Sequence, residues 1–489
     1  MQLAKSITLK KIKTLHCSPA ARYGLFLTFL FSICTAFNPV FSQDNSPYSR
    51  YGIGDLVPST HINTRGMAGI SAGYIDILSI NFNNPASYSA FEAWMETKKK
   101  KLASGRATLD IGINMDSRTL RETNPARKFT AGNLLFSYVQ VGVPLKKGWG
   151  LSFGLRPVSR ISYKIFRGER LKDPITGQPI DTATSRFEGD GGSYLASAGT
   201  GFMVFRKEKF SKKDKKKSIG EESLSAGLNA GFLFGKINNG SRREFRNDTV
   251  QYFSANYETI TTYGNLYFNA GLQYRLPLDE GNKFFSAGIY GSWGQSLNAS
   301  QDRIRETFVY DATLGDLRLD SVQDIRNVKG KIIMPASITA GFILQKFPVF
   351  KKENGWLLGL DVMYQSWDNY RFYGQKDSVR NKLELRIGGQ INPVPRENYF
   401  SRVAYRGGFI FGPDYLSVQG KLPQFGISMG LGLPVGNYNR LSPNQASVIN
   451  LAFEFIKRGN NDNLLKENLF RLSAGFSLSD IWFQKRKYD

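Results

Sequence analysis

This chain of 489 residues has little of the chemistry that most enzymes and metal proteins use. Both of its cysteines, Cys17 and Cys34, lie in the first 42 residues, and so does His16, one of its two histidines. Removal of that segment would leave His61 alone, which excludes disulfide bonds, thiolate metal sites and most histidine-based triads and zinc sites. No spacing singles out a pair of carboxylates. We therefore expect no enzyme, no bound metal and no cofactor.

Residues 1–42 have the composition of a secretory signal peptide. The apolar run "LFLTFLFSICTAF" (25–37) follows a basic, acid-free stretch. About thirteen apolar residues are too few to span a bilayer, which takes ~20. Cleavage after Ser42 would release the mature chain, and the alternative is an uncleaved membrane anchor. Cys34 has no small residue directly before it, which argues against a lipoprotein anchor. The basic residues of the segment are Lys5, Lys10, Lys11, Lys13 and Arg22.

The net charge of +25 is strongly basic, and only five of the positive charges belong to residues 1–42. Export argues against nucleic acid as a partner, whereas an anionic membrane surface or anionic solutes fit this charge. The alternative is that the charge only keeps long loops soluble. Past residue 42 no apolar run reaches 18 residues. This excludes transmembrane helices but not a membrane barrel, whose strands hide half of their residues from lipid.

From residue 107 onward, apolar and polar residues alternate. In "TLDIGINMD" (108–116), every second residue is apolar, which places the apolar set on one face of a strand. "SLSAGLNAGFLFG" (223–235) and "QFGISMGLGL" (424–433) repeat the pattern. A soluble sandwich would also alternate. Long strands, a glycine-rich polar face and aromatic residues at strand ends favour a membrane barrel. The expected aromatic girdle contains Trp149, Trp293, Trp356, Trp367 and Trp482.

The alternation predicts fourteen strands, at about 107–116, 133–143, 149–160, 193–206, 223–237, 263–275, 283–297, 332–346, 355–366, 380–391, 400–411, 424–433, 447–457 and 468–483. Long connections at 117–132, 161–192, 238–262 and 298–331 alternate with short turns, as outside loops and periplasmic turns do in such barrels. One long basic connection, "RKEKFSKKDKKKSIGEE" (206–222), breaks this alternation. We therefore predict an all-β, antiparallel transmembrane β-barrel of about 14 strands over residues 104–489.

Residues 43–103 contain no long alternating run. A lumen ringed by ~14 strands is too wide to be filled by its own side chains. We therefore predict that this segment is an N-terminal plug, or hatch, inside the lumen, although an external tail is also possible. In "NFNNPASYSAF" (81–91), Pro85 disfavours a helical conformation of Asn84, and Asn side chains close turns onto their own backbone. The turn either takes part in gating or is only an ordered turn.

The stretch "RGMAGISAGYIDILSINFNNPASYSAF" (65–91) resembles the hatch of the long-chain fatty-acid transporter (FadL-type) outer-membrane barrels. "MYQSWDNYRF" (363–372), "LRIGGQINP" (385–393) and "RVAYRGGF" (402–409) are similar to late strands of that family, and the C-terminal "SDIWFQKRKYD" resembles its Bacteroidetes members. The residues that match its hatch motif, and to which the resemblance gives a gating role, are Arg65, Gly66, Gly69, Asn84, Pro85 and Ala86.

The resemblance implies a monomeric barrel in the outer membrane of a Gram-negative bacterium, surrounded by lipid and lipopolysaccharide. It implies passive uptake of hydrophobic small molecules such as long-chain fatty acids, with hatch gating and a lateral exit through an early strand. The alternative is a non-transporting FadL-like barrel that acts as a subunit or shuttle of an outer-membrane protein-secretion machinery. The isolated His61 argues against a lipase, and the plug argues against a general porin.

Two groups of residues are candidates for function in the barrel. Pro157 cannot donate a hydrogen bond to a β-ladder, so we expect a lateral opening there, unless this proline only ends its strand. Basic residues on the expected lumen face could hold a ligand carboxylate by charge-assisted hydrogen bonds, or could instead pair with lumen acids or the plug. These candidates are Arg156, Arg275, Arg386, Arg402 and Arg406.

Overall fold

The computed structural model describes residues 46–96, 102–123, 126–210, 218–245, 253–278, 282–311, 313–418, 420–436 and 445–482. The predicted signal peptide (1–42) and residues 211–217 of the basic connection lie outside these ranges.

The described strands form a closed, antiparallel barrel with fourteen strand positions, which confirms the predicted fold class. β9 and β10 share one position, and β11 and β12 share the next. Pairing of β19 with β3, from Leu465–Glu122 to Trp482–Gly105, closes the wall. Each predicted strand range overlaps an observed strand. The strands are β3 (Leu102–Thr123), β4 (Ala126–Lys146), β5 (Trp149–Lys172), β6 (Pro179–Phe210), β7 (Ser218–Phe245), β8 (Ser254–Pro277), β9 (Lys283–Ser292), β10 (Gln295–Asp311), β11 (Gly315–Met334), β12 (Ser337–Lys346), β13 (Gly355–Gln365), β15 (Lys382–Asn392), β16 (Ala404–Pro413), β17 (Pro423–Val435), β18 (Ala446–Arg458) and β19 (Leu465–Trp482).

The outer surface of the barrel is apolar, and the inner surface is polar. On β5, the Phe153 side chain is 47% exposed, whereas its neighbour Ser152 is 2% exposed. Leu272 and Gln273 on β8 differ in the same way. An apolar surface of this kind is stable against acyl chains and unstable against water. The alternation of apolar and polar residues in the sequence therefore indicates which side chains face lipid and which face the lumen.

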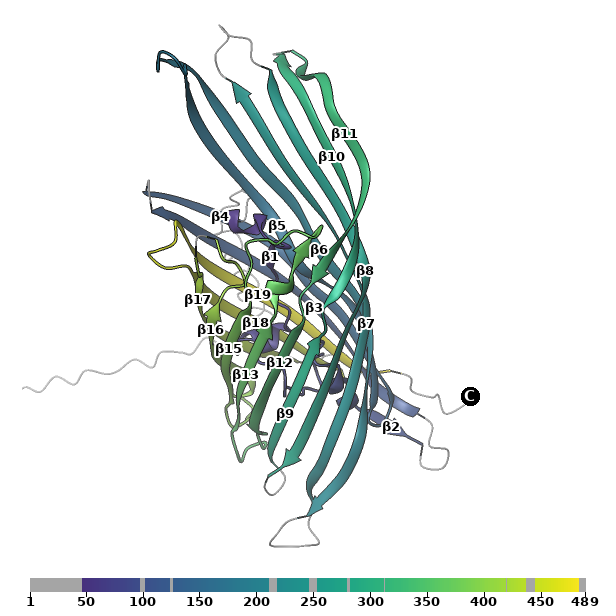
Figure 1. The fold of residues 1–489 in the computed structure, drawn as a ribbon. Helices are drawn as coiled ribbons and strands as arrows, with labels where there is room; N and C mark the ends of the chain where they lie inside the picture. Colours follow the sequence, from purple (N-terminus) through teal and green to yellow (C-terminus); the bar gives the residue numbers. More distant parts are fainter. Residues whose placement is uncertain are drawn as a thin grey trace, which may run out of the picture. The chain divides into compact units, whose positions relative to one another are not determined.

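Several strands continue far past the apolar belt. The predicted loops 117–132, 161–192, 238–262 and 298–331 are wrong, because most of these residues continue strands. The described residues of 117–132 belong to β3 and β4. The other three stretches extend β5 to β8, β10 and β11 as a tall sheet at one end of the barrel, here termed the outer end (Figure 1). β6 alone has 32 residues. At ~3.3 Å per residue and a tilt of ~45°, it rises roughly 75 Å, against an apolar band of about 25 Å. Both faces of this extension meet water, so the alternation that marks a lipid-facing strand is lost there.

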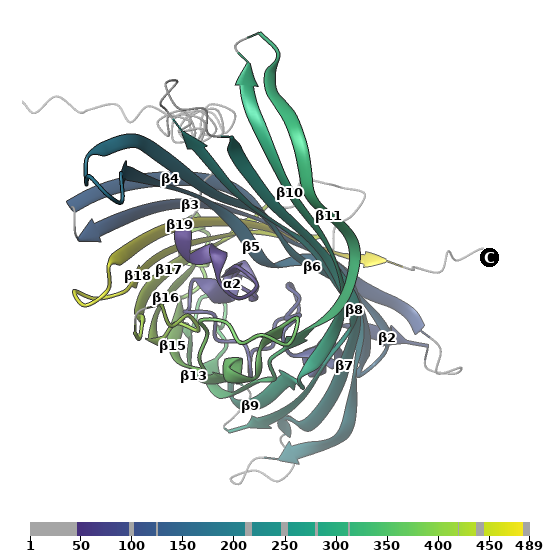
Figure 2. The ribbon, with the colours of Figure 1, turned by 45° about the horizontal axis from the view of Figure 1, so that its top comes forward.

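Most of the N-terminal segment, with α2 (Ile62–Arg65), lies inside the barrel, whereas β2 (Ala93–Met95) lies beside β3 (Figure 2). The other elements of the segment are η1 (Pro47–Arg50), β1 (Asp55–Leu56) and η2 (Pro85–Ala90), and β2 pairs with the start of β3. Most side chains between residues 60 and 89 are buried. Helices among the described residues span three to six residues, and none is long and apolar enough to cross a membrane. We call residues 46–96 the hatch.

Two connections at the outer end fold back onto the hatch. The first carries η3 (Trp367–Asn369) and β14 (Arg371–Phe372), and the second follows β16. Trp367 is only 2% exposed and lies 4.3 Å from Tyr415, measured between ring centroids, in a cluster that also contains Tyr48 and Ile53 of the hatch. The assignment of Trp367 to a lipid-facing girdle is therefore wrong, because this residue follows the end of β13 and turns into the lumen. At the opposite end, η4 (Tyr399–Arg402) precedes β16.

A buried ion network joins the hatch to the wall. Asp55 of β1 accepts hydrogen bonds from Arg118 of β3 at 2.6 Å and from Arg458 of β18 at 3.0 Å. Glu467 of β19 contacts both of these arginines, and Asp414 lies 2.9 Å from Arg458. Burial opposes ionisation of Asp55, but the two guanidinium groups hold its pKa below the usual range. The network therefore ties the hatch to three wall strands by groups that must stay charged.

We predict that Arg118→Ala destabilises the folded barrel by about 3–5 kcal/mol, because it leaves buried carboxylates without their cation. Thermal unfolding in detergent measures the effect. Arg326→Ala, which removes an exposed cation 2.9 Å from Asp324, is the matched control and should leave the melting temperature unchanged. Equal melting temperatures for Arg118→Ala and the control would contradict a structural role of the network.

The stability that Asp55 contributes should depend on pH. Because its folded-state pKa lies below the unfolded-state value of about 3.9, this contribution is fully present above roughly pH 4. It is then lost as the pH falls through the lower, folded-state value. The melting temperature of Asp55→Asn should therefore approach that of the wild type at acidic pH. A difference between the two proteins that stays constant from pH 7 to pH 3 would contradict this assignment.

Candidate functional site

The Asn-Pro-Ala turn forms the start of η2. Asn84 caps it: the backbone is extended there, and the side-chain Oδ1 accepts a hydrogen bond from the Ala86 N–H at 3.2 Å. The Asn84 Nδ2 donates to the carbonyl oxygens of Ala72, at 2.8 Å, and of Leu272 on β8, at 3.2 Å. One side chain therefore fixes the turn, holds a second hatch segment and touches the wall.

Glycine in the wall makes this close approach possible. A Cβ at Gly271 on β8 would overlap the Asn84 side chain, and a Cβ at Gly227 on β7 would overlap the Pro85 carbonyl group. The wall therefore meets the turn backbone to backbone. This explains why the polar face of the predicted strands is so rich in glycine.

Arg65 fixes the other end of the hatch motif. Its guanidinium donates to Asn114 of β3 and to Ser137 of β4, both at 2.7 Å, and to the Pro58 carbonyl at 3.0 Å. No carboxylate contacts this side chain among the described residues, and burial lowers its pKa to about 10. Arg65 thus binds the wall through neutral acceptors and fixes the orientation of α2.

The two motif glycines occupy tight positions after α2. Gly66 lies against Gly430 of β17, and its Cβ, if present, would be 2.8 Å from the Gly430 Cα. Gly69 has φ +77°, a left-handed conformation that favours glycine. The chain reversal after Arg65 therefore needs both glycines, one for space and one for its backbone angle.

Wall carboxylates that the sequence analysis did not single out bind the hatch backbone. The Asp361 Oδ2 of β13 accepts from the N–H groups of Ser71, at 2.6 Å, and Ala72, at 3.0 Å. Asp110 of β3 accepts from the Ile80 N–H at 2.7 Å and lies 3.2 Å from the His61 Nε2. Asp361 is the acid on the polar face of its strand segment 355–365, whereas Asp110 shares its face with Asp116. A carboxylate on a lumen-facing position was the available signal that something inside the lumen needed an acceptor.

The wall is interrupted between β4 and β5. The last backbone pair joins Val139 to Leu155. Beyond it, β4 pairs only with β3, and β5 pairs with β6, although both outer halves belong to the described residues. The seam starts next to Pro157, and the β5–β6 register shifts between Pro157 and Ser159. The outer ends of the β3–β4 and β5–β6 hairpins lie well apart (Figure 1).

The hatch supplies the pairing that β4 leaves out at this seam. β1 pairs with β5, with Asp55 opposite Arg160. The Val57 N–H donates to the Val158 carbonyl at 3.0 Å, and the Ser46 N–H donates to the Ser162 carbonyl at 3.1 Å. Displacement of this part of the hatch would therefore leave the inner edge of β5 without a partner.

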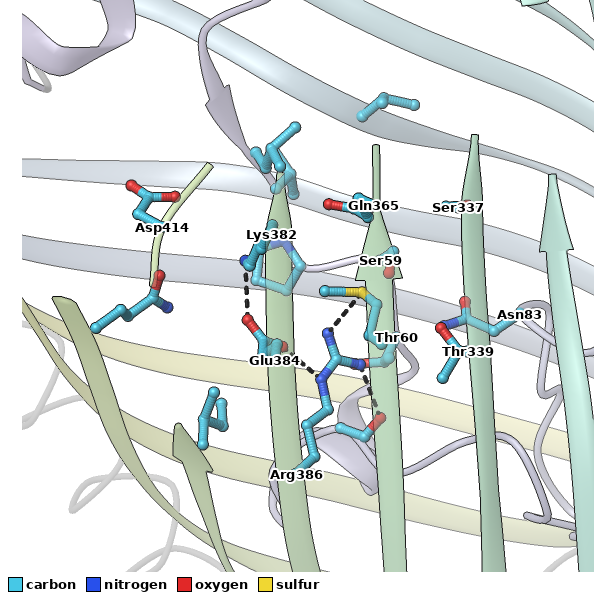
Figure 3. Close-up of a pocket in the computed structure, with 18 of the residues that line it drawn as sticks. Ser59, Thr60, Asn83, Ser337, Thr339, Gln365, Lys382, Glu384, Arg386 and Asp414 are labelled. Carbon is cyan, nitrogen blue, oxygen red and sulfur yellow. Dashed lines mark hydrogen bonds and ion pairs between the residues drawn. The ribbon is translucent and has the colours of Figure 1, made fainter. Parts of the chain in front are cut away.

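A polar cavity of about 250 Å³ lies between the hatch and the wall. In it, Glu384 lies between two cations: its carboxylate oxygens are 2.8 Å from the Lys382 Nζ and 2.6 Å from the Arg386 Nε (Figure 3). The Arg386 Nη1 also donates to the Gly69 carbonyl at 3.3 Å. Arg386 is therefore already engaged by a wall acid and by the hatch.

The five arginines proposed from the sequence do not converge on one site. Arg156 and Arg386 line the central cavity, while Arg402 and Arg406 line a second cavity of about 290 Å³ near the opposite end from the tall sheet. Arg406 donates to Gln390 and Asn450, and Arg402 donates to the Glu397 carbonyl.

Arg275 lies in neither cavity, and its guanidinium carbon is 4.2 Å from the centroid of the Phe284 ring. Arg156 stands over Phe82 of the hatch at 5.7 Å, and no carboxylate contacts it among the described residues. Arg156 is thus the proposed arginine that retains a free guanidinium inside the central cavity. The described residues contain no group of three His, Cys, Asp or Glu that could hold a metal ion.

We predict that Gly227→Ala pushes the Asn-Pro-Ala turn off the wall, because the new methyl group would overlap the backbone at Pro85. Overpacking of this kind costs typically about 1–3 kcal/mol. Ion conductance in planar bilayers should rise as the hatch loosens. Gly240→Ala on the same strand, where the nearest atom to the added Cβ is 3.5 Å away in Glu188, should conduct like the wild type. Unchanged conductance of Gly227→Ala would show that the turn does not depend on this contact.

Comparison with solved structures gives barrels of low sequence identity. A FadL homologue from Pseudomonas aeruginosa is 14% identical with a TM-score of 0.47, over 88% of this chain and 100% of that one. The toluene transporter TodX from P. putida is 14% identical with a TM-score of 0.46, over 87% and 99%. The toluene transporter TbuX from Ralstonia pickettii is 13% identical with a TM-score of 0.43, over 88% and 99%.

No curated protein sequence matches the chain. A protein-family model, described as BamG, matches residues 25–489, which include the hatch and every strand of the barrel. The chain belongs to the BamG family.

Proposed function

We propose that this protein is an outer-membrane barrel for the passive uptake of hydrophobic small molecules such as long-chain fatty acids, with the hatch as the gate and a lateral exit between β4 and β5. The observation that carries the proposal is the seam next to Pro157, where the wall loses its own pairing and the hatch replaces it. A hydrophobic molecule gains by leaving sideways into lipid rather than into water. Gate and exit would then be one structure.

The motif residues have defined places in this mechanism. Arg65 and Asn84 hold the two ends of the hatch motif to different parts of the wall. Gly66, Gly69, Pro85 and Ala86 shape the turns between those anchors. A movement that releases β1 from β5 while these anchors hold would open the seam without expelling the whole hatch. β1 is attached to β5 through few backbone bonds, but Asp55 of β1 is also paired with Arg118 and Arg458, so this local opening must separate those ion pairs. It still costs less than global unfolding.

The chemistry of the cavity bears on the ligand. Its walls are rich in paired charges, and Arg156 is the cation there without an acid partner among the described residues. A fatty-acid carboxylate is a suitable partner for a free guanidinium. Arg386 would contribute only if Glu384 released it, and Arg275, Arg402 and Arg406 would act elsewhere on the path. We propose Arg156 as the main carboxylate contact.

The apolar outer surface supports a place in the outer membrane, surrounded by lipid and lipopolysaccharide, and we expect export by the cleaved signal peptide of residues 1–42. We expect a monomer, because the fourteen strand positions close on themselves through the pairing of β19 with β3, so that closure needs no second copy. The Bacteroidetes resemblance of the last eleven residues and the absence of a nucleic-acid partner stay predictions.

A second candidate is a non-transporting subunit or shuttle of an outer-membrane protein-secretion machinery. Two observations favour it. Hatch, loops and ion pairs fill much of the lumen, and the sheet of β5 to β8, β10 and β11 rises far beyond the apolar belt. Such a sheet offers a protein partner a large surface and does not contribute to a channel.

The seam can be tested by locking it. Arg160 of β5 donates to the Asn133 Oδ1 of β4 across it at 3.4 Å. We predict that Asn133→Cys/Arg160→Cys, bridged by a short crosslinker with a disulfide in its spacer, reduces palmitate uptake to background in cells that lack their own fatty-acid transporter. Reduction of the spacer should restore uptake. Both native cysteines lie in the predicted signal peptide, so the mature chain would carry no competing thiol.

The matched control is Thr119→Cys/Thr130→Cys, a facing pair in the intact β3–β4 ladder, which should tolerate the same crosslink. Uptake that persists through a locked seam would rule out this exit. Background uptake by every form, together with co-purification of secretion proteins, would favour the second candidate.

A further inference from the structure

The described wall has a second interruption, separated from the β4–β5 seam by β5, β6, β7 and β8. The β8–β9 ladder ends at Ala270–Gly291, and the β8–β10 ladder begins at Gly264–Asn298. Between them, residues 265–269 of β8 have no backbone ladder partner in β9 or β10, and all of these residues are described. The neighbouring position is broken at the same level, between the end of β11 at Met334 and the start of β12 at Ser337.

Side chains replace the missing backbone bonds at this interruption. The Gln295 Oε1 accepts from the Phe268 N–H at 2.8 Å, and its Nε2 donates to the Phe268 carbonyl at 3.2 Å, so that one amide side chain imitates a peptide group. The Tyr267 hydroxyl donates to the Ser292 Oγ at 2.9 Å. Side-chain bonds can rotate away while the strands stay paired above and below. The interruption is therefore a closed window rather than a continuous wall.

An apolar cleft of about 610 Å³ opens on the outer surface at the window. Leu272, Ile289, Trp293 and Ile338 line it, and each of them is 39–52% exposed. Trp293 lies ten residues along the wall from Lys283, the first residue of β9, which corresponds to a height of ~24 Å for a tilted strand. This height is still within the apolar band of about 25 Å. Acyl chains, not water, would face the cleft.

The cleft and the central polar cavity share part of their lining. Tyr290, Gly291, Ser292 and Ser337 border both. Arg156 also lines the cavity and is its cation without an acid partner among the described residues. An apolar hollow that faces lipid thus adjoins a polar chamber that contains a free positive charge. Only a molecule with an apolar tail and an anionic head matches both halves.

We propose that this window is a binding site for a single-chain amphiphile with a carboxylate or phosphate head, which enters from the bilayer. The chain lies in the cleft beside Leu272 and Trp293. The head passes Ser292 and Ser337 and reaches Arg156, where a charge-assisted hydrogen bond holds it. This site goes beyond the proposed uptake function, because it is loaded from the membrane and retains its ligand whether or not the β4–β5 seam opens.

The hatch would sense an occupied window. The Tyr290 hydroxyl, at the boundary between cleft and cavity, is 2.8 Å from the Ser71 Oγ and accepts from the Asn83 Nδ2 at 3.3 Å. Asn83 directly precedes the Asn-Pro-Ala turn. A head group that displaces Tyr290 would therefore act directly on the hatch.

The test is equilibrium binding to delipidated, detergent-purified protein, with palmitate and hexadecyl phosphate as anionic probes and hexadecanol as the neutral probe. We expect about one anionic probe per barrel. Arg156→Gln should weaken the binding of both anionic probes about tenfold or more and leave the affinity for hexadecanol nearly unchanged. The reason is that a hydrogen bond to a charged group contributes about 1.5–3 kcal/mol. Arg156→Lys should retain part of the affinity.

Filling the cleft gives the complementary variant. Ala270→Phe places an aromatic ring in the cleft and should weaken the binding of all three probes about tenfold. Ala198→Phe, at an exposed position on the outer face of β6 outside the cleft, is the matched control and should bind like the wild type. Brominated palmitate should also quench fluorescence, and Trp293→Phe should remove most of that quenching. Heat-modifiable migration on gels reports whether each variant is folded.

Wild-type affinity of a folded Ala270→Phe variant would overturn the cleft as the site. Equal loss of the anionic and neutral probes in Arg156→Gln, or no loss of either, would overturn the position of the head. The β4–β5 crosslink separates this proposal from uptake: the locked protein should lose uptake but still bind palmitate. If the crosslinked protein loses uptake and still binds palmitate, both proposals are supported. If the crosslinked protein binds palmitate and Ala270→Phe does not weaken that binding, only the uptake proposal stands.

Discussion

Every backbone N–H and C=O group at membrane depth must find a partner inside the protein, because lipid offers none. Most of this barrel meets the constraint by closing its ladder from β19 to β3. Among the described residues, the ladder stops at the β4–β5 seam and at the window, and other groups take over its hydrogen bonds there. At the β4–β5 seam the partner is hatch backbone, and at the β9–β10 window it is the amide of Gln295. The wall is therefore complete only in the presence of groups that can move.

The same constraint explains how the hatch is held. Its irregular backbone cannot form a ladder of its own. Wall acids such as Asp110 and Asp361 accept from its N–H groups, and the amide side chain of Asn84 donates to the carbonyl of Ala72. Glycines in the wall let backbone meet backbone around the Asn-Pro-Ala turn. The polar face of the strands has two roles. It lines the lumen, and its shape and hydrogen-bonding groups match the backbone of the hatch.

Charge distribution separates fixed parts from free ones. Asp55, Arg118, Arg458 and Glu467 neutralise one another in the network that anchors the hatch, and Glu384 is shared between Lys382 and Arg386. Buried charges require such pairing because desolvation is costly. Arg156 departs from this pattern, because no acid contacts it among the described residues. Arg156 therefore differs from the other described cations of the central cavity, which have acidic partners.

The alternation of apolar and polar residues was enough to predict the barrel, its fourteen strands and the presence of a segment that could not belong to the wall. Contact with lipid imposes this alternation wherever a strand crosses the membrane. It also indicated the capped turn at Asn84 and Pro85, whose cause is local. It did not reveal the tall sheet, since strands with water on both faces need not alternate. The two-residue repeat of a strand assigns an arginine to the lumen face, but it gives neither its height nor its partner. Five candidates were therefore grouped that the fold distributes over two cavities and a third place. The position of Trp367, the seam and the window depend on which strands stop beside one another, and that is settled by contacts between residues far apart in the chain.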